Sequence, residues 1–240
     1  MSRVTSGVAG HDAVRTPPRS TGRTTAPGRR QRVRYTLYGS HMSGSTYKVA
    51  LLLSLARKPF GYVHVGLREG AHKTPQFLAK SRYGQVPCLR DANLYLCQSA
   101  AILEHVAETT HRFNGRTSGE IARIREWMYW DFDKLAGPVY RLRARKTGFR
   151  LYGDELAAYW TAEAEAALKF LDETLKSTPW LASRRATIAD IDIYGVVRYA
   201  PEAGLGLVTC RNIARWMKRI EALPGFGRPQ DILPKEDRLP

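Results

Sequence analysis

Cysteine is scarce in this sequence, and its few copies form no recognisable set. Only three of the 240 residues are cysteine, namely Cys88, Cys97 and Cys210. An odd number cannot pair completely into disulfides, and the sequence has neither a C-x-x-C motif nor histidines at zinc-like spacing. We therefore expect a reducing, cytoplasmic location and no bound metal.

Long apolar runs are also missing. No stretch approaches the roughly 20 apolar residues that a membrane-spanning helix requires. The first strongly apolar stretch, Val49 to Ala56, lies well inside the chain, so we expect neither a membrane span nor a secretory signal. Hydrophobic residues make up 43% of the chain and charged residues 25%, which is the balance of a globular protein in water.

Acidic residues are few: 22 Asp and Glu stand against 38 Lys and Arg, giving a net charge of +16. Such a charge can indicate nucleic-acid binding. However, the chain before Tyr35 has eight arginines and one aspartate, and so carries seven of these charges. Residues 1–33 are rich in Thr, Ser, Pro and Gly without a periodic apolar face. We expect a disordered, solvated tail or a mis-called start site, and no nucleic-acid partner. The alternative is an arm that binds nucleic acid or an anionic surface, or a transit peptide.

Strand and helix patterns alternate from residue 33 to about 108. The sequence predicts strands at 33–38, 60–67, 86–90 and 94–96, and helices at 47–57, 74–78 and 98–108. A helix connects the first two strands, which therefore pair in parallel through a right-handed crossover. The last two strands form a hairpin and must run antiparallel. The pattern predicts an α/β domain at 34–112 with a mixed four-stranded sheet.

Only helices are predicted after a linker at about 113–118. They cover 120–146, 154–176, 187–199 and 212–223. The third begins with Thr187-Ile188-Ala189-Asp190, a capping box. We expect an all-α domain at 119–232.

Several motifs, in this order and spacing, resemble the soluble glutathione transferases over roughly 34–229. They are Leu37-Tyr38-Gly39 with Ser43 to Val49, His72 to Leu78 with Tyr83 to Pro87, Gln98 to Ile102, Trp180-Leu181 with Thr187 to Asp190, and Ile220 to Pro224. The resemblance is to a serine-type bacterial class. It implies a thioredoxin-like N-terminal domain followed by a helical one, glutathione as co-substrate, and a homodimer.

Ser43 occupies, by this resemblance, the position of the catalytic serine. The glutathione thiol has a pKa of about 9, and lowering it by about two units requires roughly 2.7 kcal/mol of preference for the thiolate. A hydroxyl donor supplies about 1.5–3 kcal/mol and a helix N-terminus roughly 0.3–1 kcal/mol. Ser45 is the second choice and Tyr38 a weaker one. Alternatively, Ser43 only caps the following helix.

The resemblance also assigns residues that bind the tripeptide. It implies a cis peptide between Val86 and Pro87, with the Val86 backbone pairing with the cysteinyl unit. Gln98 and Ser99 begin a helix whose free N–H groups would hold the γ-glutamyl carboxylate, unless they only cap that helix. The family often has an acidic residue where this chain has Gln98.

The glycyl carboxylate would meet Lys73, with weaker contributions from His72 and Gln85. Where the family commonly has Asn-Pro, this chain has Ser81-Arg82, and Arg82 could assist or replace Lys73. A solvated surface lysine is the alternative interpretation of Lys73.

The second substrate would be an electrophilic small molecule bound between the domains. We expect walls from His41-Met42 and from the long helix bearing Trp127, Tyr129, Trp130 and Phe132, although such aromatics are more often core or dimer contacts. We expect Cys88 and Cys97 to be buried and inert. The predicted function is transfer of the glutathione thiolate to an electrophilic carbon or a disulfide sulfur. The alternative is a non-catalytic glutathione-binding or scaffold protein.

Overall fold

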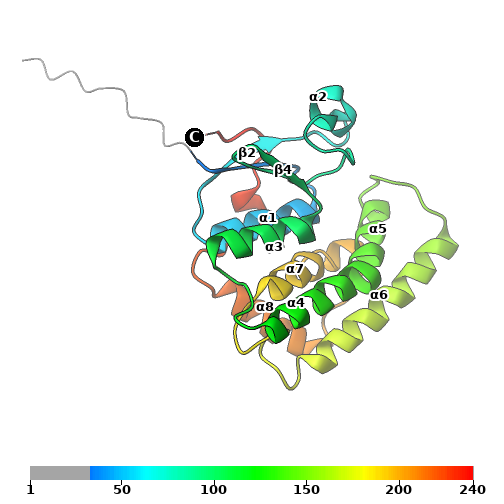
Figure 1. The fold of residues 1–240 in the computed structure, drawn as a ribbon. Helices are drawn as coiled ribbons and strands as arrows, with labels where there is room; N and C mark the ends of the chain where they lie inside the picture. The colour runs from blue at the N-terminus through cyan, green and yellow to red at the C-terminus, as the bar shows by residue number, and fades with distance from the viewer. Residues whose placement is uncertain (1–32, 240) are drawn as a thin grey trace, which may run out of the picture. The chain divides into compact units, whose positions relative to one another are not determined.

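The computed structural model describes residues 33–239, in which a four-stranded sheet is followed by helices (Figure 1). The strands are β1 (Tyr35–Gly39), β2 (Phe60–His64), β3 (Cys88–Asp91) and β4 (Leu94–Cys97). Residues 1–32 lie outside the described range, and with them nearly all of the predicted Arg-rich tail.

The sheet is mixed, with strand order β2-β1-β3-β4. β1 pairs in parallel with β2, and both β1–β3 and β3–β4 are antiparallel. This confirms the predicted mixed sheet of a thioredoxin-like domain. β2 ends three residues earlier than predicted, because its partner strand ends at Gly39, which pairs with His64. The backbone then leaves the sheet.

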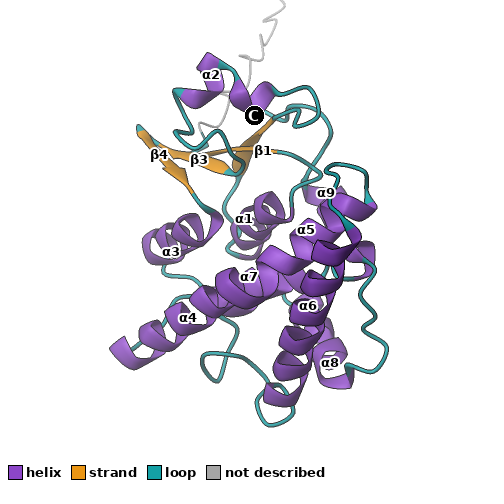
Figure 2. Ribbon diagram, turned by 90° about the vertical axis from the view of Figure 1, so that its right-hand side faces the viewer, coloured by secondary structure: helices purple, strands orange, loops and turns teal. Residues whose placement is uncertain are grey.

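Helices cover both faces of this sheet. α1 (Gly44–Leu55) and α3 (Ser99–Thr110) lie on one face, and α2 (Pro75–Leu78) lies on the other, preceded by the short 3-10 helix η1 (Ala71–Lys73) (Figure 2). α1 begins three residues before the predicted start, because Ser43 caps it. It is buried nearly all round.

The predicted helix at 120–146 is present but contains a wider turn. It consists of α4 (Ser118–Trp130), the π-helical segment η2 (Asp131–Ala136) and α5 (Gly137–Lys146). Pro138 lacks the N–H that a regular helix would use at that point, and π-helical geometry accommodates a missing hydrogen bond of this kind.

The remaining helices are α6 (Asp154–Thr174), α7 (Ile188–Val197), η3 (Pro201–Ala203), α8 (Arg211–Glu221) and α9 (Pro229–Ile232). The capping box at α7 is confirmed, since Asp190 Oδ2 accepts from Thr187 N at 2.9 Å. The sequence did not predict α9. Among residues 33–239, no helix combines the length and the apolar character needed to span a membrane.

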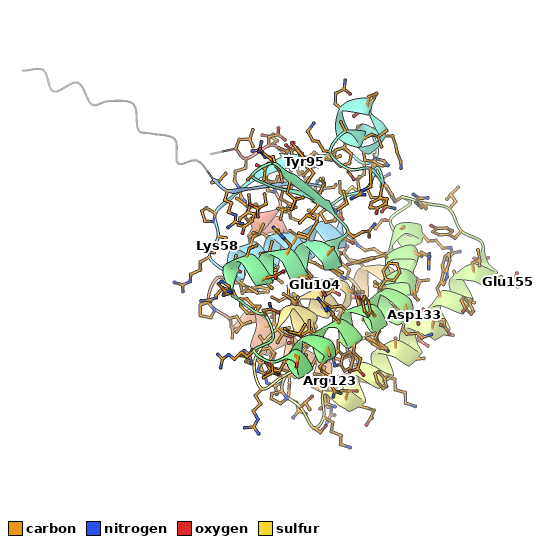
Figure 3. The ribbon with its side chains drawn as sticks, viewed as in Figure 1. Lys58, Tyr95, Glu104, Arg123, Asp133 and Glu155 are labelled. Atoms are coloured by element: carbon orange, nitrogen blue, oxygen red, sulfur yellow. The ribbon has the colours of Figure 1, made fainter. Side chains whose placement is uncertain are left out.

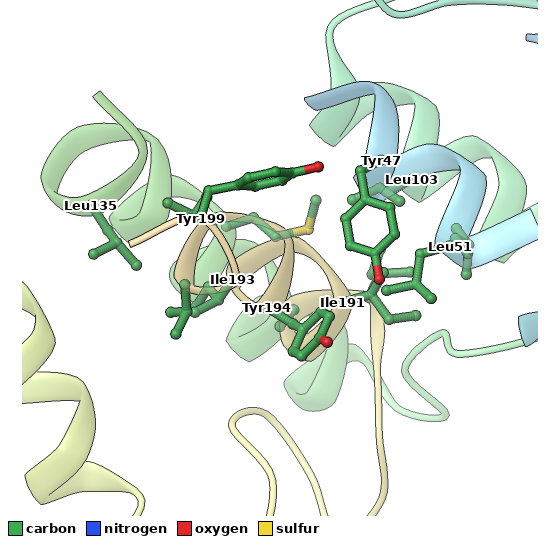
Figure 4. Packing of buried hydrophobic residues seen from close by; sticks show 14 of the residues in the cluster. Tyr47, Leu51, Leu103, Leu135, Ile191, Ile193, Tyr194 and Tyr199 are labelled. Carbon is green, nitrogen blue, oxygen red and sulfur yellow. The ribbon is translucent and has the colours of Figure 1, made fainter. Parts of the chain in front are cut away.

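α7 is buried all round because it packs between α1 and the other helices. Figure 4 shows Tyr47 and Leu51 of α1 facing Ile191 and Tyr194 of α7, with the two tyrosine rings 6.4 Å apart. One continuous core therefore joins the sheet domain to the helices, and it fixes the position of α1, whose first turn borders the cavities described next.

Charged side chains such as Lys58, Arg123 and Glu155 lie at the periphery (Figure 3). Lys48 of α1 is an exception, because it is buried between two buried carboxylates. Its Nζ lies 2.8 Å from Asp131 Oδ2 and 2.8 Å from Asp192 Oδ1. Burial opposes its charged form, but the two carboxylates raise the pKa of Lys48 above its usual value. This charged group ties α1 to η2 and α7.

Candidate functional site

A cavity of about 340 Å³ opens where the first turn of α1, the start of β3 and the start of α3 meet. Seven of its lining residues are the ones singled out from the sequence: Ser43, His72, Lys73, Gln85, Val86, Gln98 and Ser99. Ser45 also lines it. The structure therefore brings together residues that are up to 56 positions apart in the chain.

Ser43 is the N-cap of α1. Its Oγ accepts a hydrogen bond from Thr46 N at 3.1 Å, so its capping role is real. A hydroxyl that accepts one hydrogen bond still has its own proton to donate. The N–H groups of Gly44 and Ser45 in the first turn have no partner within residues 33–239, as expected at a helix N-terminus. Three potential donors therefore lie together beside the cavity.

Gly44 permits a close approach between α1 and α5. A Cβ at this position would lie 2.6 Å from the Tyr140 ring. Tyr140 is held in place by its hydroxyl, which donates to Gly195 O at 3.0 Å. The first turn of α1 is thus fixed against α5 and α7.

The peptide bond between Val86 and Pro87 is cis, as the resemblance implied. Val86 is half-buried, and its N–H and C=O make no hydrogen bond to any other described residue. The backbone of Val86 can therefore pair with an extended ligand in the manner of an added strand.

Gln98 has an unusual backbone conformation, with φ 69° and ψ 118°, which costs a non-glycine residue about 1–3 kcal/mol. Its side chain does not cap α3 but donates from Nε2 to Gln85 Oε1 at 3.4 Å. The expectation that Gln98 might simply cap its own helix is wrong. The first N–H groups of α3, including that of Ser99, remain available to an anion.

The other end of the cavity is cationic. Lys73 lies exposed in η1, and a Cβ on Gly84 would be 3.1 Å from its Nζ, so Lys73 and the turn are in contact. His72 has a lowered pKa, first because of burial and then because of Lys73 and Arg150. Its imidazole is therefore neutral at pH 7.

Arg82, which was expected to be able to assist or replace Lys73, does not line the cavity. It is exposed outside the cavity, with its guanidinium 5.5 Å from the Tyr83 ring. Its neighbour Ser81 is buried and donates to Gln85 O at 2.9 Å. The additional cation is Arg150, which lines the cavity together with Phe149. Sequence reasoning missed both, because they lie in the loop between α5 and α6, far from any motif.

A second cavity, of about 520 Å³, adjoins the first. The two share six lining residues, among them Ser43, Gln85 and Arg150, so they form one continuous site. The remaining walls of the second cavity are Met42, Gly44, Tyr140, Arg141, Arg143, Ala144, Thr147 and Tyr152.

None of the four aromatic residues expected as walls lines the second cavity. Trp127 and Trp130 pack against Phe170 of α6, with ring centroids 6.1 and 5.5 Å apart, and Tyr129 is exposed. Phe132, also exposed, lines a neighbouring cavity that includes Ser45, Gln98 and Ser99. The long helix does form a wall, but through α5, because the chain reaches the sheet domain only after η2. Of the expected loop, Met42 lines this cavity.

Two neighbouring groups stay outside both cavities. His41 stacks on His64, with ring centroids 5.2 Å apart. Tyr38 packs towards Tyr95 at 6.2 Å, and burial raises the pKa of its phenol. Tyr38 is therefore poorly placed as a donor to a ligand in either cavity.

All three cysteines lie within the described range and none forms a disulfide. Burial raises the pKa of the Cys88 thiol to about 12, and its neighbour across the hairpin is Cys97. Neither lines a cavity of this site. Within residues 33–239 no group of three or more His, Cys, Asp or Glu is arranged to hold a metal ion.

Comparison with known proteins gives a consistent result. Residues 33–108 match the family model "Glutathione S-transferase, N-terminal domain" and residues 138–224 match "Glutathione S-transferase, C-terminal domain". Glutathione S-transferase 3 of Zea mays is 30% identical over 213 residues, which is 82% of this chain and 94% of that protein. The disulfide-bond oxidoreductase YfcG of Escherichia coli is 25% identical over 193 residues, 76% of this chain and 88% of that protein.

Among solved structures, a possible glutathione S-transferase from Rhodopseudomonas palustris superposes with a TM-score of 0.75. It has 31% identity and covers 82% of this chain and 90% of its own. The chain therefore belongs to the glutathione S-transferase family, an enzyme family whose thiol substrate is glutathione.

Proposed function

We propose that this protein is a serine-type glutathione transferase in which the Ser43 hydroxyl stabilises the glutathione thiolate. The observation that carries this proposal is the single cavity lined by Ser43 and by all six residues expected to bind the tripeptide. The capping bond from Thr46 N fixes the Ser43 side chain and leaves its proton free. The first-turn N–H groups of α1 add a favourable field at the sulfur.

The remainder of the tripeptide then has a defined place. The Val86 backbone pairs with the cysteinyl unit, and the start of α3 at Ser99 receives the γ-glutamyl carboxylate. Gln98 accepts from the ammonium group through its amide oxygen, in place of the acidic residue common in the family. Lys73, with Gln85 and the neutral His72 nearby, faces the glycyl carboxylate.

In the reaction the thiolate sulfur attacks an electrophilic carbon, a carbon–sulfur bond forms, and the leaving group departs with its electron pair. No proton has to be removed during this step, because the sulfur is already ionised. A general base is therefore not required, and Ser43 acts by lowering the thiol pKa.

Ser43→Ala tests this role, and Ser45→Ala tests the second candidate in the same turn. Loss of one charge-assisted hydrogen bond, about 1.5–3 kcal/mol, predicts a 10- to 100-fold lower kcat/KM with a chlorodinitrobenzene. The pKa of the bound thiol, followed by ultraviolet absorbance of the thiolate, should rise by about one to two units. Ser43→Thr keeps a hydroxyl and should retain most activity.

Ser43→Ala also removes a helix cap, which costs about 1 kcal/mol of stability. Urea unfolding of each variant separates this loss from the catalytic effect. An unchanged thiol pKa in a folded Ser43→Ala protein would remove Ser43 from the mechanism. Retention of the wild type on glutathione-agarose without turnover of any electrophile would instead favour a non-catalytic glutathione-binding protein.

A disulfide sulfur is a second possible electrophile, because one relative is named a disulfide-bond oxidoreductase. In that reaction the bound thiolate attacks a disulfide, forms a mixed disulfide and releases the other sulfur as a thiolate. A second glutathione then completes the reduction. Since the Cys88 thiol is buried with a raised pKa, the chemistry would use glutathione thiols alone. Turnover of hydroxyethyl disulfide by a Cys88→Ala variant measures this.

We also propose a homodimer formed through the sheet domain and the partner's long helix. Tyr129 and Phe132 project from α4 and η2 with 69% and 78% of their surface exposed, which is unusual for aromatic side chains. Sedimentation velocity should give about twice the mass of one chain. The double variant Tyr129→Lys and Phe132→Lys should sediment as a monomer if these residues form the interface.

The predicted domain limits, 34–112 and 119–232, remain part of this proposal. So does a cytoplasmic location, which is supported by three cysteines without a disulfide.

A further inference from the structure

The second cavity has an uneven charge. Three arginines line it, Arg141, Arg143 and Arg150, and its lining contains no aspartate or glutamate. The adjoining glutathione cavity adds Lys73 and again has no acidic residue in its lining. The side chains that line the second cavity therefore include three cations and no anion.

Arg143 already has partners. Its Nε donates to Glu202 at 2.8 Å, another nitrogen donates to Met42 O at 2.6 Å, and its guanidinium lies 4.1 Å from the Tyr199 ring. Its charge is balanced by Glu202, and its function is to hold the Met42 loop against α5. It is not the residue that attracts an anion.

Arg141 and Arg150 differ from Arg143, because neither forms an ion pair with any residue in the range 33–239. Arg141 rests with its guanidinium 5.3 Å from the Trp160 ring, which orients it without neutralising it. Arg150 lies at the junction of the two cavities. Two cations without an ion-pair partner in the range 33–239 thus border the space next to Ser43, and Arg141 also lines a neighbouring cavity with Asp131, Asp133 and Asp192.

Glutathione does not account for both charges. Its two carboxylates are matched by the start of α3 and by Lys73 in the first cavity. Arg141 lines the second cavity but not the first, so it lies on the side of the other substrate. Guanidinium groups bind carboxylate and sulfonate groups through paired, charge-assisted hydrogen bonds.

The other walls are aromatic. Tyr140 is fixed by its bond to Gly195 O, and Tyr152 packs edge-on against Trp160 with ring centroids 4.8 Å apart. Phe149 completes this surface at the junction. A volume of about 520 Å³ is sufficient for a substituted aromatic ring.

We propose that the second substrate is an aromatic electrophile carrying a carboxylate or sulfonate group, with Arg141 as its main anion-binding residue and Arg150 as a second one. This inference rests on the proposed transferase function. The thiolate forms a bond to the activated ring carbon and the halide leaves with its electron pair. The anionic substituent takes no part in the bond changes and serves only to orient the ring.

A chlorodinitrobenzoate and its methyl ester test the proposal, because they differ mainly in charge. For each electrophile, the enzymatic kcat/KM is divided by the rate constant of its uncatalysed reaction with glutathione. The value for the carboxylate divided by the value for the ester defines the preference for the anion. We expect the wild type to prefer the carboxylate. Arg141→Gln should lower this preference about tenfold, the equivalent of about 1.4 kcal/mol, mainly through the KM of the carboxylate.

Arg123→Gln is the matched control, since Arg123 is exposed on α4 away from both cavities and the variant has the same net charge. It should leave the preference unchanged. Arg150→Gln should lower the preference, and the KM for glutathione is measured alongside it because Arg150 lines both cavities. If Arg150→Gln lowered kcat/KM equally for both electrophiles and raised the KM for glutathione, Arg150 would be assigned to glutathione. Its proposed role in binding the anionic electrophile would then be overturned.

The inference itself fails if both electrophiles are turned over and Arg141→Gln leaves their ratio within twofold of wild type. That outcome differs from failure of the proposed function, in which neither electrophile is turned over by the wild type or by any variant. The ester reaction therefore shows which of the two ideas has failed.

Discussion

Replacing Lys48 by methionine should destabilise the protein strongly and in a pH-dependent way. Lys48 is 3% exposed and lies between Asp131 and Asp192, which are 1% and 2% exposed. Methionine fills a similar volume but leaves two buried carboxylates next to each other. Removing one partner of a buried ion pair costs about 3–5 kcal/mol, and here the lysine serves two carboxylates, so we expect about 4 kcal/mol or more.

The pH dependence has a definite sign. The Lys48 ammonium stays protonated throughout pH 5–8, because its pKa is raised and its contribution to stability is lost only in alkali. Burial, and after it repulsion from Asp192, raises the pKa of Asp131 to about 7 in the wild type. Without Lys48 that pKa must rise further. The native variant then binds protons that the unfolded chain releases above about pH 4, so its stability falls as the pH rises.

Urea unfolding followed by tryptophan fluorescence, at one protein concentration and at pH 5 and pH 8, measures both effects. Lys58→Met is the matched control, because Lys58 is exposed and makes no ion pair with a described residue. This variant should change the free energy of unfolding by no more than about 0.5 kcal/mol. Adding Asp131→Asn to Lys48→Met should recover part of the stability. If Lys48→Met lowered the free energy of unfolding by less than about 1 kcal/mol, and equally at both pH values, the reasoning would be refuted.

Three further predictions concern single residues. Asp190→Ala should cost about 3–5 kcal/mol in urea unfolding, because Asp190 caps α7 and also accepts from Trp216 Nε1 at 3.0 Å; a loss under 1 kcal/mol would contradict this. Burial raises the pKa of the Cys88 thiol to about 12, so in the native protein at pH 8 this thiol should resist a disulfide-forming label and react with it only after denaturation. Labelling as fast in the native protein as in the denatured one would show that Cys88 is not buried. Tyr38→Phe should keep kcat/KM within about twofold of wild type, since Tyr38 lines neither cavity; a loss matching that of Ser43→Ala would make it the thiolate donor instead.

The sequence predicted best what depends on local pattern. The β3–β4 hairpin, the start of α3 at Gln98 and Ser99, and the capping box at Thr187 each depend on residues within a few positions of one another. The glutathione-site candidates also lie in short motifs next to strand and helix ends. The resemblance carried by these motifs named seven residues that the structure brings to one cavity.

Contacts between distant segments could not be predicted in this way. Arg150 reaches the site only because the loop after α5 passes over it, and nothing in the pattern around residues 147–153 indicates this. The aromatic residues at 127–132 do not line the second cavity, and the sequence could not show this because spacing gives a helical face but not its partner. The π-helical segment, in turn, depends on Pro138 and coincides with the burial of Asp131 against Lys48.

Activation of a thiol by one hydroxyl requires that the hydroxyl be held in place, and the structure supplies this along the whole of α1. Ser43 is fixed at its first turn by the bond from Thr46 N, and Gly44 lies against Tyr140. One turn further on, the Tyr47 hydroxyl donates to Gly227 O at 3.0 Å, and Lys48 joins α1 to η2 and α7. α5, which carries Tyr140 and Arg141, directly follows η2. The same buried charges therefore fix the position of Ser43, the proposed thiolate donor, relative to the wall proposed to bind the second substrate. A loss of Lys48 should therefore raise the KM for the electrophile even under conditions where the variant remains folded.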